Sequence, residues 1–463
     1  MPMTCSQLKE QLDQQIEHDA FCKSVTVIEV RNRQEIEDSG KIKYSMNIPL
    51  PHLIEDPHRL LADFPKDRKL VFQCASGRRS HMAATKAVEA GFTNVYNLEG
   101  GLAAWKAEYP LQPFKKNHSP TIHTILDPAT DTAQYIVTDE DTRETLLIDP
   151  VLDYDPFSGT VKADTAKQLI EFVQKYHLNV TKIIDTHVHA VKLPFHFNSS
   201  HPIVSPNPFG LGSSFSRKLS SPAFGPQVGL TVVTLRYTTL QHPQLLTRPF
   251  VLAQPPFLIG NNVTKVQTVF RDKYNFEPRD LPTTGEQFSQ LVGDGTEWTL
   301  GKDIRCKAIA TPGHTPACMS WLIGDALFAG DTLFMPDIGT ARCDFPGGSA
   351  EQMYKSIHTL YDTLLDDTRV FVGHDYPSER PYAFVTFLEA HKRNNKMINE
   401  KVGLEDYIKA RKRRDDQLKA PRYLHPSLQT NLRGGDLPVA ERRTGEIDKE
   451  AGRFFKIPVR FIE

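Results

Sequence analysis

Four short clusters of histidine and aspartate, each directly after an apolar run, constrain the fold of this chain more than any other feature. The clusters are residues 186–189, 311–314, 330–332 and 373–375, and the apolar runs before them are residues 181–184, 304–310, 326–329 and 370–372. Short apolar runs predict buried strands, so the clusters are expected where strands end and loops begin. An α/β scaffold places its chemistry at such positions. Unrelated histidines have no reason to share this context, and the clusters together indicate a metal site.

These clusters and the strand-end motif Leu-Ile-Asp-Pro at 147–150 resemble the metallo-β-lactamase superfamily over roughly residues 120–463. The resemblance implies an αββα metallo-β-lactamase sandwich. Within the superfamily, the sequence is most similar to persulfide dioxygenases that are fused to a rhodanese domain. The segments that carry this similarity are residues 330–334, 339–348, 373–376 and 428–438.

In that family one Fe(II) per chain is held by two histidines and one aspartate, which correspond here to His187, His314 and Asp331. Such a facial arrangement leaves open coordination positions for a thiolate substrate and O2. Zinc is the alternative metal. His189 and His374 are expected to orient the ligands or to exchange protons.

Hydrolases of the same fold assemble two metals, and they need an Asp-His pair two residues after the second histidine of the first cluster. Here Ala190 is followed by Val191 and Lys192. The missing pair coincides with an anomaly, because residues 186–271 contain no Asp or Glu. Residues 191–254 are rich in Ser, Pro, Phe and Leu without a helical or strand period. We interpret them as an insert, either translated non-coding sequence or a genuine surface loop.

The N-terminal part alternates strand-like apolar runs with helical stretches, as in 69–73 followed by 80–90, which predicts a parallel α/β domain. The loop between them begins at Cys74 and reads Cys-Ala-Ser-Gly-Arg-Arg-Ser. Backbone N–H groups, the positive end of the following helix, and the side chains of Arg78 and Arg79 all favour a thiolate at this cysteine.

This loop and its surroundings resemble the rhodanese family of sulfurtransferases over roughly residues 8–115, with support from Glu35 and residues 100–105. The resemblance implies an α/β rhodanese-like domain with a parallel sheet. It also implies that Cys74 carries a sulfane sulfur as a persulfide. The loop amides and Arg79 would then hold the anionic donor or acceptor.

The expected organisation is a rhodanese-like domain at 1–115, a linker at 116–120 and a metallo-β-lactamase-fold domain at 121–463. Two charged residues of the second domain, Arg342 and Asp344, lie just beyond the aspartate of the third cluster, in the stretch that resembles the family's substrate-side loop, and are expected to bind the substrate. The arginine could hold a carboxylate of glutathione or the sulfite product, or it could form a salt bridge within its loop.

Composition excludes several other classes of function. A formal net charge of −1 and a near-neutral pI argue against a large nucleic-acid footprint. The basic run 409–416 lies on a predicted helix and is interpreted as a solvated face. The sequence contains no apolar run long enough to predict a membrane span. Six cysteines without paired spacing suit a reducing compartment, which favours the cytoplasm with mitochondria as the alternative.

We therefore expect an enzyme that oxidises glutathione persulfide, or a similar low-molecular-weight persulfide, with O2 to sulfite. Sulfane-sulfur transfer through Cys74, with thiosulfate and glutathione as further small-molecule partners, would accompany this reaction. The first alternative is a metal-dependent thioester hydrolase of the glyoxalase II kind, which requires a second metal. The other is a persulfide carrier or sensor with a disabled metal domain. The sequence does not determine the oligomeric state.

Overall fold

The computed structural model describes residues 1–17, 25–111, 119–190, 192–194, 255–377, 380–438 and 455–458. Residues Met1–His196 and Pro256–Glu463 form one compact unit, and the helices and strands of the described residues all belong to it. The predicted linker 116–120 and the predicted insert 191–254 lie outside the described residues, apart from 119–120 and 192–194.

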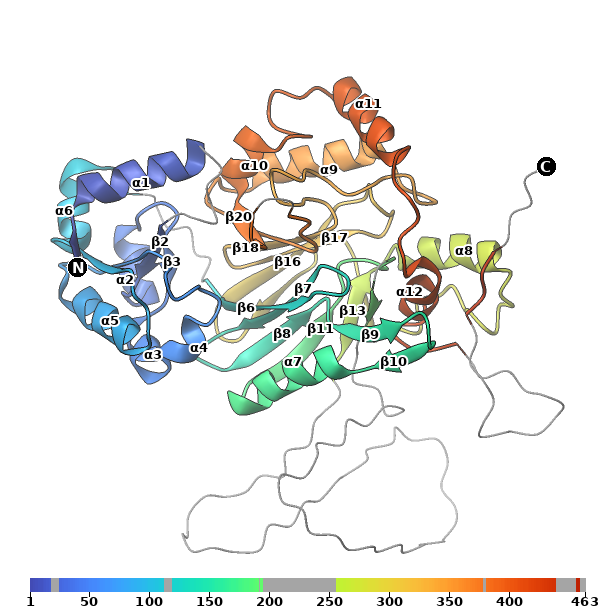
Figure 1. Cartoon of the computed structure of the whole chain (residues 1–463), viewed down its shortest axis with the longest axis horizontal. Helices are drawn as coiled ribbons and strands as arrows, with labels where there is room; N and C mark the ends of the chain where they lie inside the picture. Colours follow the sequence, from blue (N-terminus) through green and yellow to red (C-terminus); the bar gives the residue numbers. More distant parts are fainter. Residues whose placement is uncertain are drawn as a thin grey trace, which may run out of the picture. The chain divides into compact units, whose positions relative to one another are not determined.

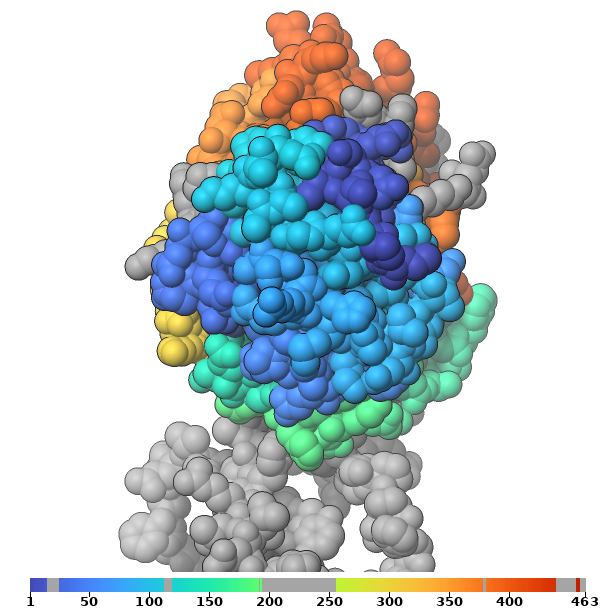
Figure 2. Space-filling view, turned by 90° about the vertical axis from the view of Figure 1, so that its left-hand side faces the viewer, coloured from blue at the N-terminus to red at the C-terminus, as the bar shows by residue number. Residues whose placement is uncertain are grey.

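The N-terminal residues build a five-stranded sheet in which every pairing is parallel, as the sequence predicted. Its strand order is β1 (Pro2–Met3), β5 (Val95–Leu98), β4 (Leu70–Gln73), β2 (Thr26–Glu29) and β3 (Met46–Asn47). The helices are α1 (Cys5–Glu17), α2 (Arg33–Ser39), α3 (Leu50–Glu55), α4 (Pro57–Leu60), α5 (Arg78–Glu89) and α6 (Gly101–Glu108). Strand β4 is buried along its whole length, as expected where helices cover both faces of a parallel sheet. Figure 2 looks onto this domain, in blue and cyan.

Two six-stranded sheets come after this domain. The first has the order β14-β13-β11-β8-β7-β6, with β6 (Thr121–Asp127), β7 (Thr132–Thr138), β8 (Glu144–Ile148), β11 (Asn179–Ile184), β13 (Phe257–Gly260) and β14 (Gln290–Val292). The second has the order β15-β16-β17-β18-β19-β20, with β15 (Glu297–Leu300), β16 (Ile304–Ala310), β17 (Met319–Ile323), β18 (Ala326–Gly330), β19 (Arg369–Val372) and β20 (Val385–Phe387). A small sheet joins β10 (Thr160–Lys162), β9 (Val151–Asp155) and β12 (Leu193–Pro194).

Helices cover the outer faces of the two large sheets, which gives the predicted αββα sandwich (Figure 1). They are α7 (Asp164–Lys175), α8 (Val263–Tyr274), α9 (Ala350–Thr363), α10 (Leu388–Asn394), α11 (Leu404–Asp415) and α12 (Leu424–Asn431). One apolar cluster joins α9, α10 and α11 to β18 and β19, so these helices cover the second sheet.

The two large sheets face each other across an apolar core. Trp321 on β17 is fully buried there, and its ring lies edge-on to that of Trp298 with 5.7 Å between centroids. Tyr135 on β7 packs edge-on against Phe328 and Phe371 of the opposite sheet, at 5.1 and 5.5 Å. This packing holds the ends of β11, β16, β18 and β19 in place, and the four histidine and aspartate clusters lie just beyond those ends.

Most expected strands and helices are present, with ends displaced by a few residues. The interpretation of residues 409–416 as a solvated face is wrong for Arg411. Its side chain is buried on α11, donates to both the Asp415 carboxylate and the carbonyl of Thr340, and so ties the helix to the loop after β18. Charge alone did not show this, because a buried guanidinium and an exposed one have the same sequence signature. Among the described residues, no helix combines the length and the apolar character that a membrane crossing requires.

The core packing generates a stability prediction. Trp321→Ala should lower the free energy of unfolding by about 3–5 kcal/mol, because it removes a fully buried ring between the two sheets. Trp321→Phe is the matched control and should cost only about 1–2 kcal/mol, since it keeps most of the ring and removes an indole N–H that has no partner among the described residues. Urea midpoints of the two variants measure the difference, and equal midpoints would contradict the core assignment.

Candidate functional site

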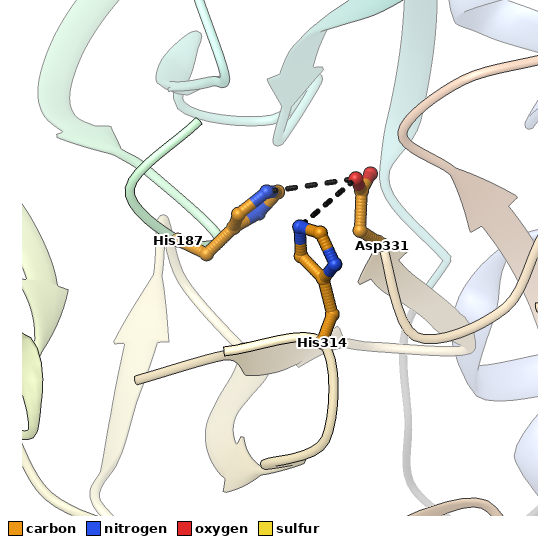
Figure 3. Close-up of side chains that lie close together, drawn as sticks. All are labelled: His187, His314 and Asp331. Carbon is orange, nitrogen blue, oxygen red and sulfur yellow. Dashed lines mark ion pairs between the residues drawn. The ribbon is translucent and has the colours of Figure 1, made fainter. Parts of the chain in front are cut away.

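Three predicted metal ligands from separate strand ends come together. His187 follows β11, His314 follows β16 and Asp331 follows β18. The Nε2 atoms of both histidines lie 3.6 Å from Oδ2 of the aspartate (Figure 3). The ligand atoms of the three residues all lie within 4.8 Å of one another, and all three side chains are buried. The distances are too long for hydrogen bonds and suit three atoms that share one ion.

Hydrogen bonds at the opposite ring nitrogens orient both imidazoles. Nδ1 of His314 lies 2.7 Å from the carbonyl oxygen of Arg342 and therefore donates to it. Nδ1 of His187 lies 3.0 Å from Thr186 Oγ1, which itself donates to Asp149 Oδ2 at 2.9 Å and is left to accept. In each ring Nε2 then carries a lone pair directed at the shared position. Metal-bound histidines are held in this way.

His374, which the sequence placed outside the ligand set, also points at Asp331. Its Nε2 lies 3.6 Å from Oδ1 of that carboxylate, and neither atom has a hydrogen-bond partner among the described residues. Its Nδ1 faces the carbonyl oxygen of Asp131 at 3.2 Å, so Nε2 again offers a lone pair. Buried, unpartnered ligand atoms of this kind fit a bound cation.

Burial sets the protonation of these groups. It lowers the pKa of His187 well below its usual range, lowers that of His374 to about 4, and raises that of Asp331 to about 6. Burial also lowers the pKa of His314, and the charge of Asp331 partly offsets this effect. In the same way, the charge of His314 partly offsets the rise in the pKa of Asp331. The imidazoles are thus neutral near pH 7, the form that binds metals.

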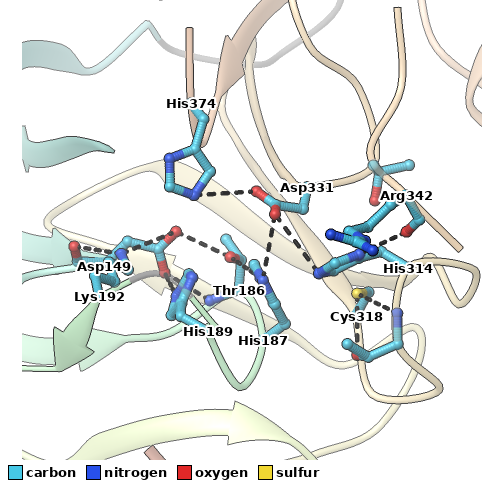
Figure 4. A network of polar contacts seen from close by, with 12 residues as sticks. Asp149, Thr186, His187, His189, Lys192, His314, Cys318, Asp331, Arg342 and His374 are labelled. Carbon is cyan, nitrogen blue, oxygen red and sulfur yellow. Dashed lines mark hydrogen bonds and ion pairs between the residues drawn. The ribbon is translucent and has the colours of Figure 1, made fainter. Parts of the chain in front are cut away.

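A second cluster of buried ligand atoms consists of Asp149, Asp185 and His189. Figure 4 shows Asp149 and His189 beside the first cluster. Oδ1 of Asp149 accepts from the Thr186 N–H at 2.8 Å and lies 3.2 Å from Nε2 of His189. The ammonium of Lys192 donates to the Asp149 carbonyl at 2.8 Å and lies 3.8 Å from its Oδ2. Lys192 stands in the segment where hydrolases of this fold have the Asp-His pair, which this chain lacks. Nothing in the sequence indicated that the lysine would be buried.

The two charged residues expected on the substrate side pair with each other. Arg342 makes two hydrogen bonds of 2.6 Å to the carboxylate of Asp344, and it lies over the ring of Phe345 at 5.0 Å. The salt bridge within the loop is therefore formed, while the Arg342 carbonyl orients His314. Cys343 between them is buried, and burial raises the pKa of its thiol, which argues against a working nucleophile.

In the N-terminal domain, Cys74 lies between β4 and α5 with its sulfur surrounded by donors. Sγ accepts from the Gly77 N–H at 3.2 Å, the Ser80 N–H at 3.4 Å and the Ser80 hydroxyl at 3.3 Å. Burial opposes the thiolate, but the bonds from Ser80 and the loop amides outweigh it and lower the pKa of Cys74. Gly101 must be glycine here, because a Cβ at its φ of +57° would lie 2.4 Å from the Cys74 carbonyl oxygen.

The two loop arginines differ in their surroundings. Arg79 donates to both carboxylate oxygens of Glu35, at 2.7 and 2.5 Å, while Arg78 is exposed. Glu35 is itself fixed by the capping box at the start of α2. An anion held by Arg79 would therefore share that guanidinium with Glu35. The donors nearest to the sulfur are instead the Gly77 N–H and the Ser80 hydroxyl.

Thr186 was not singled out by the sequence, and it generates a prediction. Thr186→Val keeps the shape of the side chain but removes the hydroxyl that links Asp149 to His187. Zinc affinity, measured by competition with a chromophoric chelator, should fall about 10- to 100-fold, as for other losses of a ligand-orienting group. Thr186→Ser keeps the hydroxyl and should retain the affinity. Unchanged affinity in the valine variant would contradict the role of this bond.

Ser80 generates a second prediction, for the thiolate. Ser80→Ala removes the hydroxyl that lowers the pKa of Cys74, so the pKa should rise and the thiolate fraction at pH 7 should fall. The alkylation rate of this cysteine by iodoacetamide should therefore drop at neutral pH and approach the unsubstituted rate at high pH. Ser76→Ala, which changes an exposed side chain in the same loop, is the control and should not alter the pH dependence of the alkylation rate.

Comparison with known proteins supports both halves of this description. A rhodanese-like domain model matches residues 5–108, and a metallo-beta-lactamase superfamily model matches residues 291–374. Glyoxylase B2 of Dictyostelium discoideum is 34% identical over 334 residues, which cover 72% of this chain and 94% of that protein. A probable metallo-hydrolase of Burkholderia pseudomallei is 34% identical over 350 residues, covering 73% and 99%. The crystal structure of ETHE1 from Myxococcus xanthus aligns at 23% identity with a TM-score of 0.45, covering 68% of this chain and 99% of that one. The chain therefore belongs to the metallo-beta-lactamase superfamily and carries a rhodanese-like domain in residues 5–108.

Proposed function

We propose that this protein oxidises a low-molecular-weight persulfide such as glutathione persulfide with O2, and that its N-terminal domain transfers sulfane sulfur. The observation that carries the first part is the set of two histidines and one carboxylate formed by His187, His314 and Asp331. Such a facial set with open positions is the arrangement that non-haem iron(II) oxygenases use. When bound there, iron(II) supplies redox chemistry towards O2 together with positions for a thiolate. We propose one iron per chain, with zinc as the alternative.

Residues around the triad would orient the metal ligands and bind the anionic groups of the substrate and product. Thr186 and the Arg342 carbonyl keep the lone pairs of the two histidines directed inward. Burial of the three ligands excludes water from competing hydrogen bonds. The Arg342 guanidinium, already at the edge of the site, can leave Asp344 to hold a glutathione carboxylate or the sulfite. The overall reaction converts persulfide, O2 and water into thiol, sulfite and protons.

The thiolate of Cys74 would carry the second activity. It attacks the sulfane sulfur of thiosulfate, sulfite leaves, and the sulfur stays on the protein as a persulfide until an acceptor thiolate removes it. The N–H groups of Gly77 and Ser80 are placed to hold the negative charge at every stage. Its neighbours Ala75 and Ser76 are exposed, so a small molecule can approach the loop. The reaction needs no metal, and we propose that it is separable from persulfide oxidation.

A metal-dependent thioester hydrolase is the second candidate. Relatives with hydrolase names favour it, among them the cytoplasmic hydroxyacylglutathione hydrolase of Arabidopsis thaliana, 33% identical over 150 residues that cover 31% of this chain and 53% of that protein. The free Nε2 of His374 beside Asp331 also suits a second metal. Against it stands Lys192, whose ammonium lies in the neighbouring cluster.

Oxygen uptake tests the proposal. The chain reconstituted with iron(II) should consume O2 when given glutathione persulfide, and His314→Ala should lower the rate more than roughly 100-fold because it removes a ligand. Cys74→Ser should keep the uptake and lose sulfur transfer from thiosulfate. Cleavage of a glutathione thioester by the zinc-loaded chain, without persulfide-dependent uptake by the iron-loaded chain, would favour the hydrolase instead.

A further inference from the structure

Lys192 is one of the most deeply buried charged residues in the described part of the chain, and the proposed reaction does not use it. Its side chain has no solvent exposure. The loop that carries it is fixed by Asn431 on α12, whose side-chain amide donates to the carbonyls of Lys192 at 2.8 Å and His189 at 3.0 Å. Its position is therefore set by the fold. Burial lowers the pKa of Lys192, and the nearby carboxylates, first among them that of Asp149, partly offset this and favour the ammonium.

The groups around this ammonium are those of the second cluster. Asp149 provides the carbonyl at 2.8 Å and the carboxylate at 3.8 Å from the ammonium nitrogen. Asp185 is buried as well, and burial together with the charge of Asp149 raises the pKa of its carboxyl group well above the usual range. One of its carboxylate oxygens has no hydrogen-bond partner among the described residues. Nδ1 of His189 is likewise without a partner there. Two carboxylates and an imidazole, with ligand atoms within 4.8 Å of one another, are a donor set suited to a divalent cation.

The charge of Lys192 reaches the first metal position as well. Burial, and after it the charge of Lys192, lower the pKa of His374, whose Nε2 faces Asp331 without a hydrogen-bond partner among the described residues. A second divalent ion bound at the Asp149 cluster would have to approach this ammonium, which lies 3.8 Å from the Asp149 carboxylate. Like charges this close in a buried site repel strongly, because little water screens them.

We propose that Lys192 acts as a built-in cation that takes the place of a second metal ion, so that the site holds one metal. The lysine supplies the positive charge that Asp149, Asp185 and His189 would otherwise draw from a divalent ion. Removal of that charge opens the cluster to a second ion. This inference rests on the proposed metal triad, and it concerns the number of ions rather than the reaction.

Zinc content tests it. The full chain and its variants are loaded with excess zinc, separated from unbound zinc by gel filtration, and analysed for zinc per chain by mass spectrometry. The unsubstituted chain should hold about one zinc, and Lys192→Met, neutral and of similar length, should hold about twice as much. Lys192→Arg keeps the charge and is the matched control that should stay at about one.

A single zinc in Lys192→Met, or two in the unsubstituted chain, would overturn the proposal. Lys192→His serves where the methionine variant does not fold, since an imidazole is itself a ligand; it should also bind a second zinc, and failure to do so would equally overturn it. A chain without zinc contradicts the metal triad and this proposal with it. The expected zinc contents without persulfide oxidation would support the role of Lys192 while rejecting the proposed reaction.

Discussion

The candidate metal site of the second domain is centred on the carboxylate of Asp331. Histidines from three other strand ends direct Nε2 atoms at it from 3.6 Å, and none of these distances is a hydrogen bond. Burial among neutral imidazoles raises the pKa of this carboxyl group to about 6, and a bound cation would stabilise its charged form. The two large sheets hold these strand ends in place through their shared core, and this packing brings the four side chains together.

In both halves of the chain, buried polar groups are arranged to stabilise a charge, which is negative in one half and positive in the other. In the N-terminal domain, backbone and hydroxyl donors surround the sulfur of Cys74 and favour its negative charge. In the second domain, buried acceptors favour a positive charge. Among the described residues, the contacts of the Cys74 sulfur come from the N-terminal domain, and the ligand atoms around Asp331 come from the second domain. We therefore propose that either of the two proposed activities can be lost while the other is kept.

The sequence predicted the parts that depend on local pattern. The short apolar runs identified the strands that end at the clusters, and the Cys-x-x-Gly-x-Arg-Ser spacing of the loop identified Cys74. It did not predict the burial of Arg411 or Lys192, because each is buried through contacts with residues far along the chain. Thr186 was equally hidden, since a threonine beside a histidine shows its role only once the Asp149 carboxylate lies 2.9 Å away.

The ratio of O2 consumed to sulfite formed tests the central claim most directly. It should be measured on the iron(II)-loaded full chain with glutathione persulfide as the only sulfur source. The proposed oxidation predicts equal amounts of both, and no sulfite when O2 is withheld. Sulfite that forms without O2, or uptake that yields no sulfite, would contradict persulfide oxidation at the His187, His314 and Asp331 site.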